Sequence, residues 1–319
     1  MLKNPYLSVV IPVYNEEETL PILYSRLFPV LDGVGKPYEV IFVNDGSRDR
    51  SQDVLEQLHA RRPEQIRIVQ FMRNYGQHPA IMAGFEHVRG EVVVTLDCDL
   101  QNPPEDIPKL LALIEDGHDV AGGIRGDRQD KSWRKGVSKL SNILRERITN
   151  IRMTDHGCML RAYRRYIIDQ IVESGEATPF ITALSQYLAA NPAEAVVGHE
   201  ERAAGKSNYN LYKLIRYNFD LVTSFSVVPL QIFTLTGITF SILSFLLVLY
   251  IAARRVVIGP EADGIFTLFA ILFLLVSVTM AGLGLIGEYV GRIYTEVRKR
   301  PRFVVKQVVE HNGVTKEAA

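Results

Sequence analysis

The segment VVVTLDCDLQNPP, residues 92–104, joins a β-branched run to two aspartates and a proline turn. Three valines and a threonine without an intervening charge favour a short strand that is buried on both faces of a sheet. Asp97 and Asp99 follow where such a strand would end, and Pro104 suits the first turn of a helix. A buried strand that ends in polar residues and passes into a helix is the repeating unit of an α/β fold.

Three further units of this kind precede the segment along the chain. We predict strands at 7–13, 38–44, 66–72 and 92–97, and helices at 17–31, 51–61, 78–88 and 104–114. This alternation predicts a mostly parallel sheet with helices on both faces, and such sheets bind ligands at the carboxyl ends of their strands. Polar clusters stand at three of those ends: Tyr14-Asn15-Glu16, Asn44-Asp45-Gly46-Ser47 and Asp97-Cys98-Asp99. We therefore expect a ligand site there.

Two long apolar segments follow the α/β region. Residues 230–253 and 265–287 contain no charged residue, and each is long enough to span a hydrocarbon core of roughly 30 Å. Two buried core helices are the alternative, but soluble helices rarely lack charges over such a length. The connection carries only Arg254 and Arg255, whereas more basic residues flank the two segments on their outer sides. This charge distribution predicts a membrane hairpin with both chain termini in the cytoplasm.

These patterns divide the chain into four parts. Residues 1–208 form the predicted α/β domain, and 230–291 contain both membrane spans. Between them, 209–229 mixes apolar and charged residues, so it is either an amphipathic helical segment on the membrane surface or an ordinary packing helix. Residues 292–319 are predicted to be a cytoplasmic tail.

Composition excludes several classes of function. Lys plus Arg and Asp plus Glu both number 36, so nothing suggests a nucleic-acid partner, which would require a basic surplus. The two cysteines, Cys98 and Cys158, have no metal-type spacing and indicate a reducing compartment without a disulfide framework. The start of the chain lacks the apolar stretch of a signal peptide, so we expect the α/β domain to stay in the cytosol.

The residues most suited to chemistry are the aspartates of the opening segment. Asp97 and Asp99, two positions apart at a strand end, can converge on one Mg²⁺ ion, which completes its shell with water and substrate phosphate oxygens. A nucleoside diphosphate leaving group needs such a cation, because negative charge builds up on it as the sugar bond breaks. By itself the pair also fits a solvated turn. Asp45 at a neighbouring strand end, and the turn from Pro12 to Glu16, are placed to frame the same nucleotide.

Three motifs, VIPVYNE at 10–16, NDGS at 44–47 and DCDLQNPP at 97–104, together resemble the family-2 glycosyltransferases of GT-A fold, which is Rossmann-like. RNYGQH at 73–78 and DHGCMLRAYRR at 155–165 resemble their polyprenyl-phosphate branch. Within that branch the pattern is most similar to the undecaprenyl-phosphate formamido-arabinose transferases, and the resemblance extends over about residues 7–305.

The resemblance implies a metal-dependent, inverting transfer at the cytoplasmic face of the inner membrane, in the modification of lipid A. The implied donor is UDP-4-deoxy-4-formamido-L-arabinose and the acceptor is undecaprenyl phosphate. A glucosyl- or mannosyltransferase using UDP-glucose or GDP-mannose is the alternative, and a non-catalytic membrane scaffold is a further one. A processive polysaccharide synthase is disfavoured, because the only tryptophan, Trp133, lacks the Gln-x-x-Arg-Trp context. The resemblance also implies a homo-oligomer, with a tetramer as one such state.

The resemblance also assigns roles to residues. Mg²⁺ or Mn²⁺ is ligated directly by Asp99 and assisted by Asp97, and Asp155 acts with Asp99 as a catalytic residue, either as a base or by organising the acceptor. The implied nucleotide- and donor-binding residues are Pro12, Tyr14, Glu16, Asp45, Asp97, Gln101, Arg202, Lys206 and Ser207. The implied acceptor-phosphate residues are Arg161, Arg164 and Arg202. Asn208 stands where the family commonly has a lysine, so Lys206 is the substitute source of charge.

Overall fold

The computed structural model divides the chain into two compact units, Met1–Asn208 with Arg300–Ala319, and Tyr209–Lys299. The residues described in it are 5–125, 154–155, 157–176, 180–200, 219, 222–223, 225–259, 265–298, 300–311 and 313–315. Arg202, Lys206, Ser207 and most of the predicted amphipathic segment 209–229 lie outside the described residues.

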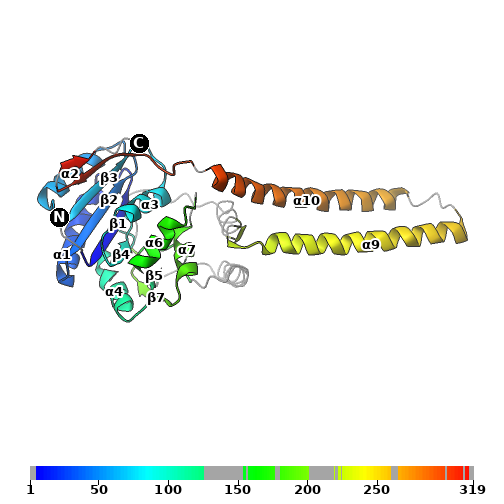
Figure 1. The fold of residues 1–319 in the computed structure, drawn as a ribbon, viewed down its shortest axis with the longest axis horizontal. Helices are drawn as coiled ribbons and strands as arrows, with labels where there is room; N and C mark the ends of the chain where they lie inside the picture. Colours follow the sequence, from blue (N-terminus) through cyan, green and yellow to red (C-terminus); the bar gives the residue numbers. More distant parts are fainter. Residues whose placement is uncertain are drawn as a thin grey trace. The chain divides into compact units, whose positions relative to one another are not determined.

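Within the described residues, one sheet of nine strands organises the first unit (Figure 1). The strands are β1 (Leu7–Val13), β2 (Tyr38–Asn44), β3 (Ile66–Phe71), β4 (Val92–Thr95), β5 (Val120–Arg125), β6 (Arg161–Arg164), β7 (Pro192–Val197), β8 (Val305–Glu310) and β9 (Gly313–Thr315). Their order is β7-β5-β6-β4-β1-β2-β3-β8-β9, in which β4, β1, β2 and β3 are parallel neighbours. The predicted α/β class with a parallel centre is confirmed.

Helices cover both faces of the parallel centre. The helices in the described part of the first unit are α1 (Thr19–Val34), α2 (Ser51–Arg61), α3 (Gln77–His87), the short 3₁₀ helix η1 (Pro104–Asp106), α4 (Ile107–Glu115), α6 (Arg165–Glu173) and α7 (Ile181–Leu188). Side chains alternate between the two faces of a strand. Val9 and Ile11 belong to the apolar core shared with α1, α2 and α4, whereas Val10 faces α3. A Cβ on Gly84 would lie 2.2 Å from Val10 Cγ1, so α3 packs closely on β1 only because residue 84 is glycine.

The second unit contains two long helices, α9 (Val228–Ile258) and α10 (Ile265–Arg298), which are drawn side by side in Figure 1. Both are long and apolar enough to cross a membrane by length and composition. Large apolar side chains stay exposed along them, including Phe245 at 64% and Phe273 at 66%. Exposed apolar surface on this scale marks a membrane or protein contact, and helix length here favours the membrane. α10 continues to Arg298, well beyond the apolar segment that ends at 287, and Tyr289 Oη in this extension donates to Ser226 O (2.7 Å).

Gly282 is the point of closest approach within this hairpin. A Cβ at residue 282 would lie 1.8 Å from the ring of Phe233, whereas a Cβ at Gly284 would meet nothing within 4 Å. We expect Gly282→Leu to destabilise the protein in detergent by about 1–3 kcal/mol, because the added side chain forces the two helices apart. Thermal unfolding would measure the loss, with Gly284→Leu as the matched control. Equal unfolding temperatures for the two variants would contradict this packing.

The segment after α10 returns to the first unit and completes its sheet. β8 pairs antiparallel with β3, with Val309 opposite Ile68 and Val308 opposite Val69, and β9 then pairs with β8. Val308 and Val309 are 4% and 8% exposed. The last part of the predicted tail 292–319 is therefore part of the sheet, although no strand was predicted there.

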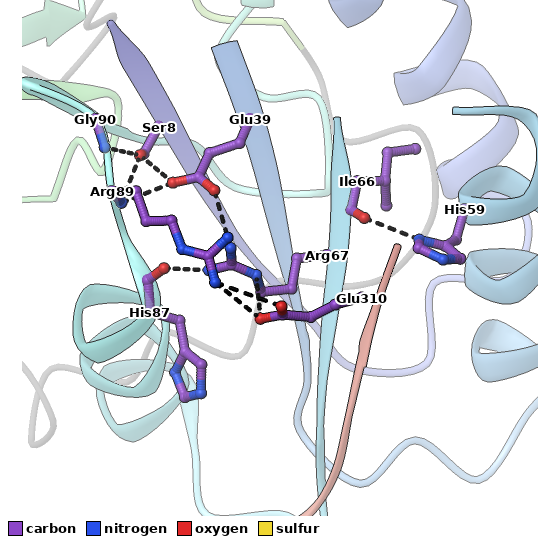
Figure 2. A network of polar contacts seen from close by, with 9 residues as sticks. All are labelled: Ser8, Glu39, His59, Ile66, Arg67, His87, Arg89, Gly90 and Glu310. Carbon is purple, nitrogen blue, oxygen red and sulfur yellow. Dashed lines mark hydrogen bonds and ion pairs between the residues drawn. The ribbon is translucent and has the colours of Figure 1, made fainter. Parts of the chain in front are cut away.

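An ionic network, buried at Arg67 and Glu39, fixes β8 at the amino-terminal edge of the parallel strands (Figure 2). Arg67 on β3 forms ion pairs with Glu39 on β2 (3.2 Å) and Glu310 on β8 (2.9 Å). Arg89 also pairs with Glu310 (3.2 Å), and Ser8 donates to Glu39 (2.7 Å). A buried arginine needs such partners, because removing its charge from water is costly. Glu310 therefore supplies a second carboxylate, so that the positive charges of Arg67 and Arg89 face two negative charges.

Candidate functional site

Two loops at the carboxyl ends of β1 and β2 are joined by direct hydrogen bonds. Asn15 N donates to Ser47 Oγ (3.0 Å), and Arg48 N donates to Asn15 Oδ1 (2.8 Å). Glu16 N donates to Ser51 Oγ at the start of α2 (2.9 Å). The first two predicted polar clusters therefore form one connected surface. Tyr14 on this surface is 42% exposed and available to a ligand, and Pro12 precedes it at the end of β1.

Asp45 is held by backbone N–H groups from a third loop. Tyr75 N donates to Asp45 Oδ1 (2.6 Å) and Gly76 N donates to Asp45 Oδ2 (2.8 Å). Burial is the largest influence on the pKa of Asp45 and raises it, while the two N–H groups oppose that rise. Gly46 has a φ of +65°, and a Cβ there would lie 2.3 Å from the carbonyl carbon of Arg73. The loop after β2 and the loop after β3 are thus packed backbone to backbone.

The third cluster lies beside the first two. Gln77, at the amino end of α3, donates from Nε2 to Asp97 Oδ1 (2.6 Å). Burial, and then the negative charges of Glu16, Asp99 and Asp97, raise the pKa of the Cys98 thiol, so each of these carboxylates is near enough to Cys98 to act on it. Cys98 is 3% exposed and belongs to the apolar core.

The backbone around Asp99 has an unusual conformation. Gln101 N donates to Asp99 Oδ1 (3.2 Å), which closes a turn over Leu100. Leu100 has a φ of +61°, and among the described non-glycine residues only Asn15 shares a positive φ (+55°). Non-glycine residues in this region cost roughly 1–3 kcal/mol, and they concentrate at functional sites. Both stand in loops at the carboxyl ends of the parallel strands.

Asp155 is brought to the same edge by β6. Thr95, at the end of β4, donates to Met159 O (2.6 Å) and is paired with Arg161 across the strands. Asp155 is 4% exposed, and Gly157 N donates to its Oδ1 (3.0 Å). Cys158 Sγ approaches Asn102 Oδ1 (3.4 Å), which links this loop to the turn after Asp99.

The structure separates the two arginines predicted to bind the acceptor phosphate. Arg161 is fully buried, and its guanidinium donates to Asp155 O (2.9 Å) and Cys158 O (3.1 Å). Arg164 lies opposite Val92, at the amino-terminal end of β4, where it donates to carbonyl groups of α4 and of His118. Arg161 therefore supports the Asp155 loop, and Arg164 is not part of the cluster at the carboxyl ends.

The predicted residues that the structure brings together come from three strand ends and one loop. They are Pro12, Tyr14, Glu16, Asp45, Asp97, Asp99, Gln101 and Asp155. Gln101 O also accepts from Glu200 N (2.9 Å), so Glu200 lies beside this cluster. Gln77 was not among the predicted site residues, although it belongs to the motif RNYGQH that carries part of the resemblance.

His78 is a half-buried side chain that follows Gln77 at the start of α3. Its Nδ1 is buried and has no hydrogen-bond partner among the described residues, and burial lowers its pKa. The folded protein therefore prefers neutral His78, whereas the unfolded chain protonates near pH 6.5. We expect folding stability to fall as the pH drops below about 7, and to fall less steeply in His78→Gln. Thermal unfolding between pH 5 and 8 would measure this, and parallel pH profiles for the two proteins would contradict it.

Comparisons with known proteins agree on one family. The sequence model described as "Glycosyl transferase family 2" matches residues 8–172. An undecaprenyl-phosphate 4-deoxy-4-formamido-L-arabinose transferase of Shewanella sediminis is 46% identical over 95% of this chain and 92% of its own length. The protein of the same name from Pectobacterium carotovorum is 47% identical over 97% of this chain and 94% of its own length.

Solved structures show a more distant likeness. Glucosyl-3-phosphoglycerate synthase of Mycobacterium tuberculosis, in complex with Mn²⁺, UDP and glucosyl-3-phosphoglycerate, is 17% identical, with a TM-score of 0.49. The match covers 69% of this chain and 78% of that chain. Residues 1–349 of Staphylococcus aureus TarS match with 17% identity and a TM-score of 0.40, over 62% of this chain and 58% of that chain.

Proposed function

The chain belongs to glycosyl transferase family 2, and we propose that it transfers 4-deoxy-4-formamido-L-arabinose from UDP to undecaprenyl phosphate. The observation that carries this proposal is the near full-length identity of 45–47% to transferases of that name. The carboxyl-end cluster supports it, because acidic side chains gather at the ends of the parallel strands, where such sheets bind ligands. A membrane helix pair also suits an acceptor that resides in the bilayer. Modification of lipid A is the process that such a product would supply.

A divalent cation, Mg²⁺ or Mn²⁺, fits the negative charge at Asp97 and Asp99. Among the described residues no three acidic, histidine or cysteine side chains form a metal-ligand cluster. Asp97 and Asp99 suit an ion that is held by one or two carboxylates and by the phosphates of its substrate. When bound, the ion would supply positive charge to the diphosphate leaving group. In this proposal Asp99 ligates it directly and Asp97, oriented by Gln77, assists.

The nucleotide would lie across the connected loops after β1, β2 and β3. Tyr14 would offer an exposed ring to the base, and Asp45, which is held by two backbone N–H groups, would hydrogen-bond the base or the ribose. Pro12 and Glu16 frame the same surface, and Gln101 stands near the donor sugar. Arg202, Lys206 and Ser207 would grip the diphosphate in this proposal.

The acceptor phosphate needs little activation. A phosphate monoester has a second pKa near 6 and is largely ionised at neutral pH. Asp155 would then orient the acceptor without removing a proton, and a single displacement would invert the anomeric carbon. Asp155→Asn should retain most of the transfer rate at pH 7.5, because the amide preserves the shape and the acceptor oxygen for Gly157 N. A loss as large as that of Asp99→Ala would instead identify Asp155 as a base.

The membrane arrangement completes the proposal. Residues 1–208 and 292–319 would lie in the cytoplasm at the inner membrane, 209–229 on its surface, and the hairpin within 230–291 would cross it twice. A homo-oligomer, with a tetramer as one state, is part of the same proposal.

The decisive experiment is transfer of labelled sugar to undecaprenyl phosphate by the full-length protein in detergent with Mg²⁺ or Mn²⁺. The donor panel contains UDP-4-deoxy-4-formamido-L-arabinose, UDP-glucose, UDP-N-acetylglucosamine and GDP-mannose. Turnover with the first donor alone supports the proposal. Turnover only with UDP-glucose or GDP-mannose would assign a different sugar, and no turnover with measurable nucleotide binding would indicate a scaffold.

A further inference from the structure

The chain that follows the second apolar helix packs against the end of β3. Phe303 stacks on Phe71, with ring centroids 5.0 Å apart and planes inclined by 13°. Met72 N donates to Val304 O (3.0 Å), so the backbones are also joined at this point. Phe71 is only 1% exposed. The return segment thus covers the place where the chain leaves β3 toward the candidate site.

The contact continues from Phe71 into the next loop. Phe71 meets Tyr75 edge to face, with centroids 5.6 Å apart, and the Arg73 guanidinium lies 4.7 Å from the centre of the Tyr75 ring. The register of β3 and β8 shifts between Gln70 and Phe71, and Phe71 opposite Val305 is the last pair of the two strands. Aromatic contacts therefore take over from sheet hydrogen bonds in fixing the residues beyond the strand.

Residues 71–77 connect these aromatic contacts to two acidic residues of the site. Tyr75 N and Gly76 N donate to Asp45, and Gln77 Nε2 donates to Asp97. The loop has little freedom to shift independently, because Gly46 touches its backbone at Arg73. A displacement of residues 71–77 would therefore move the partners of both Asp45 and Asp97.

We propose that Phe303 is a positioning residue for the donor site. Its stack on Phe71 fixes residues 71–77, and through them the orientation of Asp45 and Asp97. The inference rests on the proposed function for the identity of the ligand, a UDP-sugar with a divalent cation. All the site residues implied by the family resemblance precede Asn208, whereas Phe303 comes a few residues after Arg298, the end of α10. The donor site is thus completed by chain from beyond the membrane hairpin.

The opposite end of β8 supplies an internal comparison. Glu310 anchors the strand at the amino-terminal edge of the sheet through Arg67 and Arg89 (Figure 2). Val309, next to it, is buried against Ile68 and belongs to the apolar core. Changes at this end weaken the docking of β8 without altering the aromatic contacts to residues 71–77. They separate general loss of strand stability from a specific effect on the site.

The test compares Phe303→Ala with Val309→Ala in the full-length protein in detergent. Hydrogen exchange of a peptide covering residues 72–77 reports the loop itself, and titration with UDP and MnCl₂ reports the site. We expect Phe303→Ala to accelerate this exchange and to weaken UDP binding by about threefold to tenfold, which corresponds to the loss of an aromatic pair. KM for the donor should rise by more than kcat falls. Phe303→Tyr keeps an aromatic ring and should leave both the exchange rate and the UDP affinity near wild type. Val309→Ala should do the same.

Each outcome has a defined meaning. Equal exchange and equal UDP affinity in Phe303→Ala and Val309→Ala would overturn the inference. Faster exchange with unchanged UDP affinity would overturn the link from the loop to the donor site. If the wild-type protein bound no UDP in the presence of Mn²⁺, the proposed donor would be wrong, and the exchange measurement alone would decide whether Phe303 fixes the loop.

Discussion

Asparagine in place of Asp99 is expected to reduce sugar transfer at least about a hundredfold, which corresponds to roughly 3 kcal/mol of transition-state stabilisation. Asparagine keeps the shape of the side chain and an oxygen for the hydrogen bond from Gln101 N, so the turn over Leu100 should persist. It lacks the negative charge that a divalent cation requires. Loss of metal binding would then leave the charge on the departing diphosphate without its counter-ion.

The measurement is the initial rate as a function of Mn²⁺ or Mg²⁺ concentration. Asp99→Asn should show a low rate and a weaker dependence on the metal, with an unfolding temperature close to wild type. Asp116→Asn, an exposed aspartate that ends α4, is the matched control and should behave as wild type. A variant that retained more than about a tenth of the rate with an unchanged metal dependence would show that Asp99 is not a ligand.

Methionine in place of Arg161 is expected to destabilise the first unit and to impair transfer. The Arg161 guanidinium is fully buried and donates to the carbonyl oxygens of Asp155 and Cys158. Methionine fills much of the volume but leaves both oxygens without these donors. An unsatisfied buried polar group costs about 1–3 kcal/mol, so we expect a loss of about 2–5 kcal/mol in the free energy of unfolding. Transfer should fall further, because the loop that carries Asp155 loses its support.

Arg164→Met is the matched control for this variant. Arg164 stands on the same strand and also donates to backbone carbonyl groups, but at the opposite edge of the sheet. Its loss should reduce stability while leaving the rate per folded molecule near wild type at a temperature where both variants are folded. Thermal unfolding and initial rates, measured on the same samples, separate the two effects. Equal rates for the two variants would mean that Arg161 does not act through the Asp155 loop.

The sequence predicted the first four strands and the helices that follow them well because their signals are local, whereas β5 to β9, α6 and α7 were not predicted. The period of apolar residues predicted four strands and four helices within about three residues of their ends. The uncharged length of 230–253 and 265–287 predicted two long apolar helices. Polar residues at strand ends predicted that their loops would meet, since parallel strands deliver their carboxyl ends to one edge of the sheet. The GT-A class and family membership followed from motifs in a fixed order.

Only the tertiary structure assigned places to Arg161 and Arg164. The two residues differ by three positions in an antiparallel strand, and a rise of about 3.3 Å per residue carries them roughly 10 Å apart, to different edges of the sheet. The sequence does not state the direction in which a strand joins the sheet, so it could not separate them. Long-range pairing likewise decided that 305–310 forms β8, that Phe303 stacks on Phe71, and that the carboxylate of Asp45 is held from a loop thirty residues further along the chain. Local patterns determine whether a segment becomes a helix or a strand. Contacts between distant segments determine which partners each side chain has and so what it can do, because these contacts depend on burial and on satisfying polar groups in three dimensions.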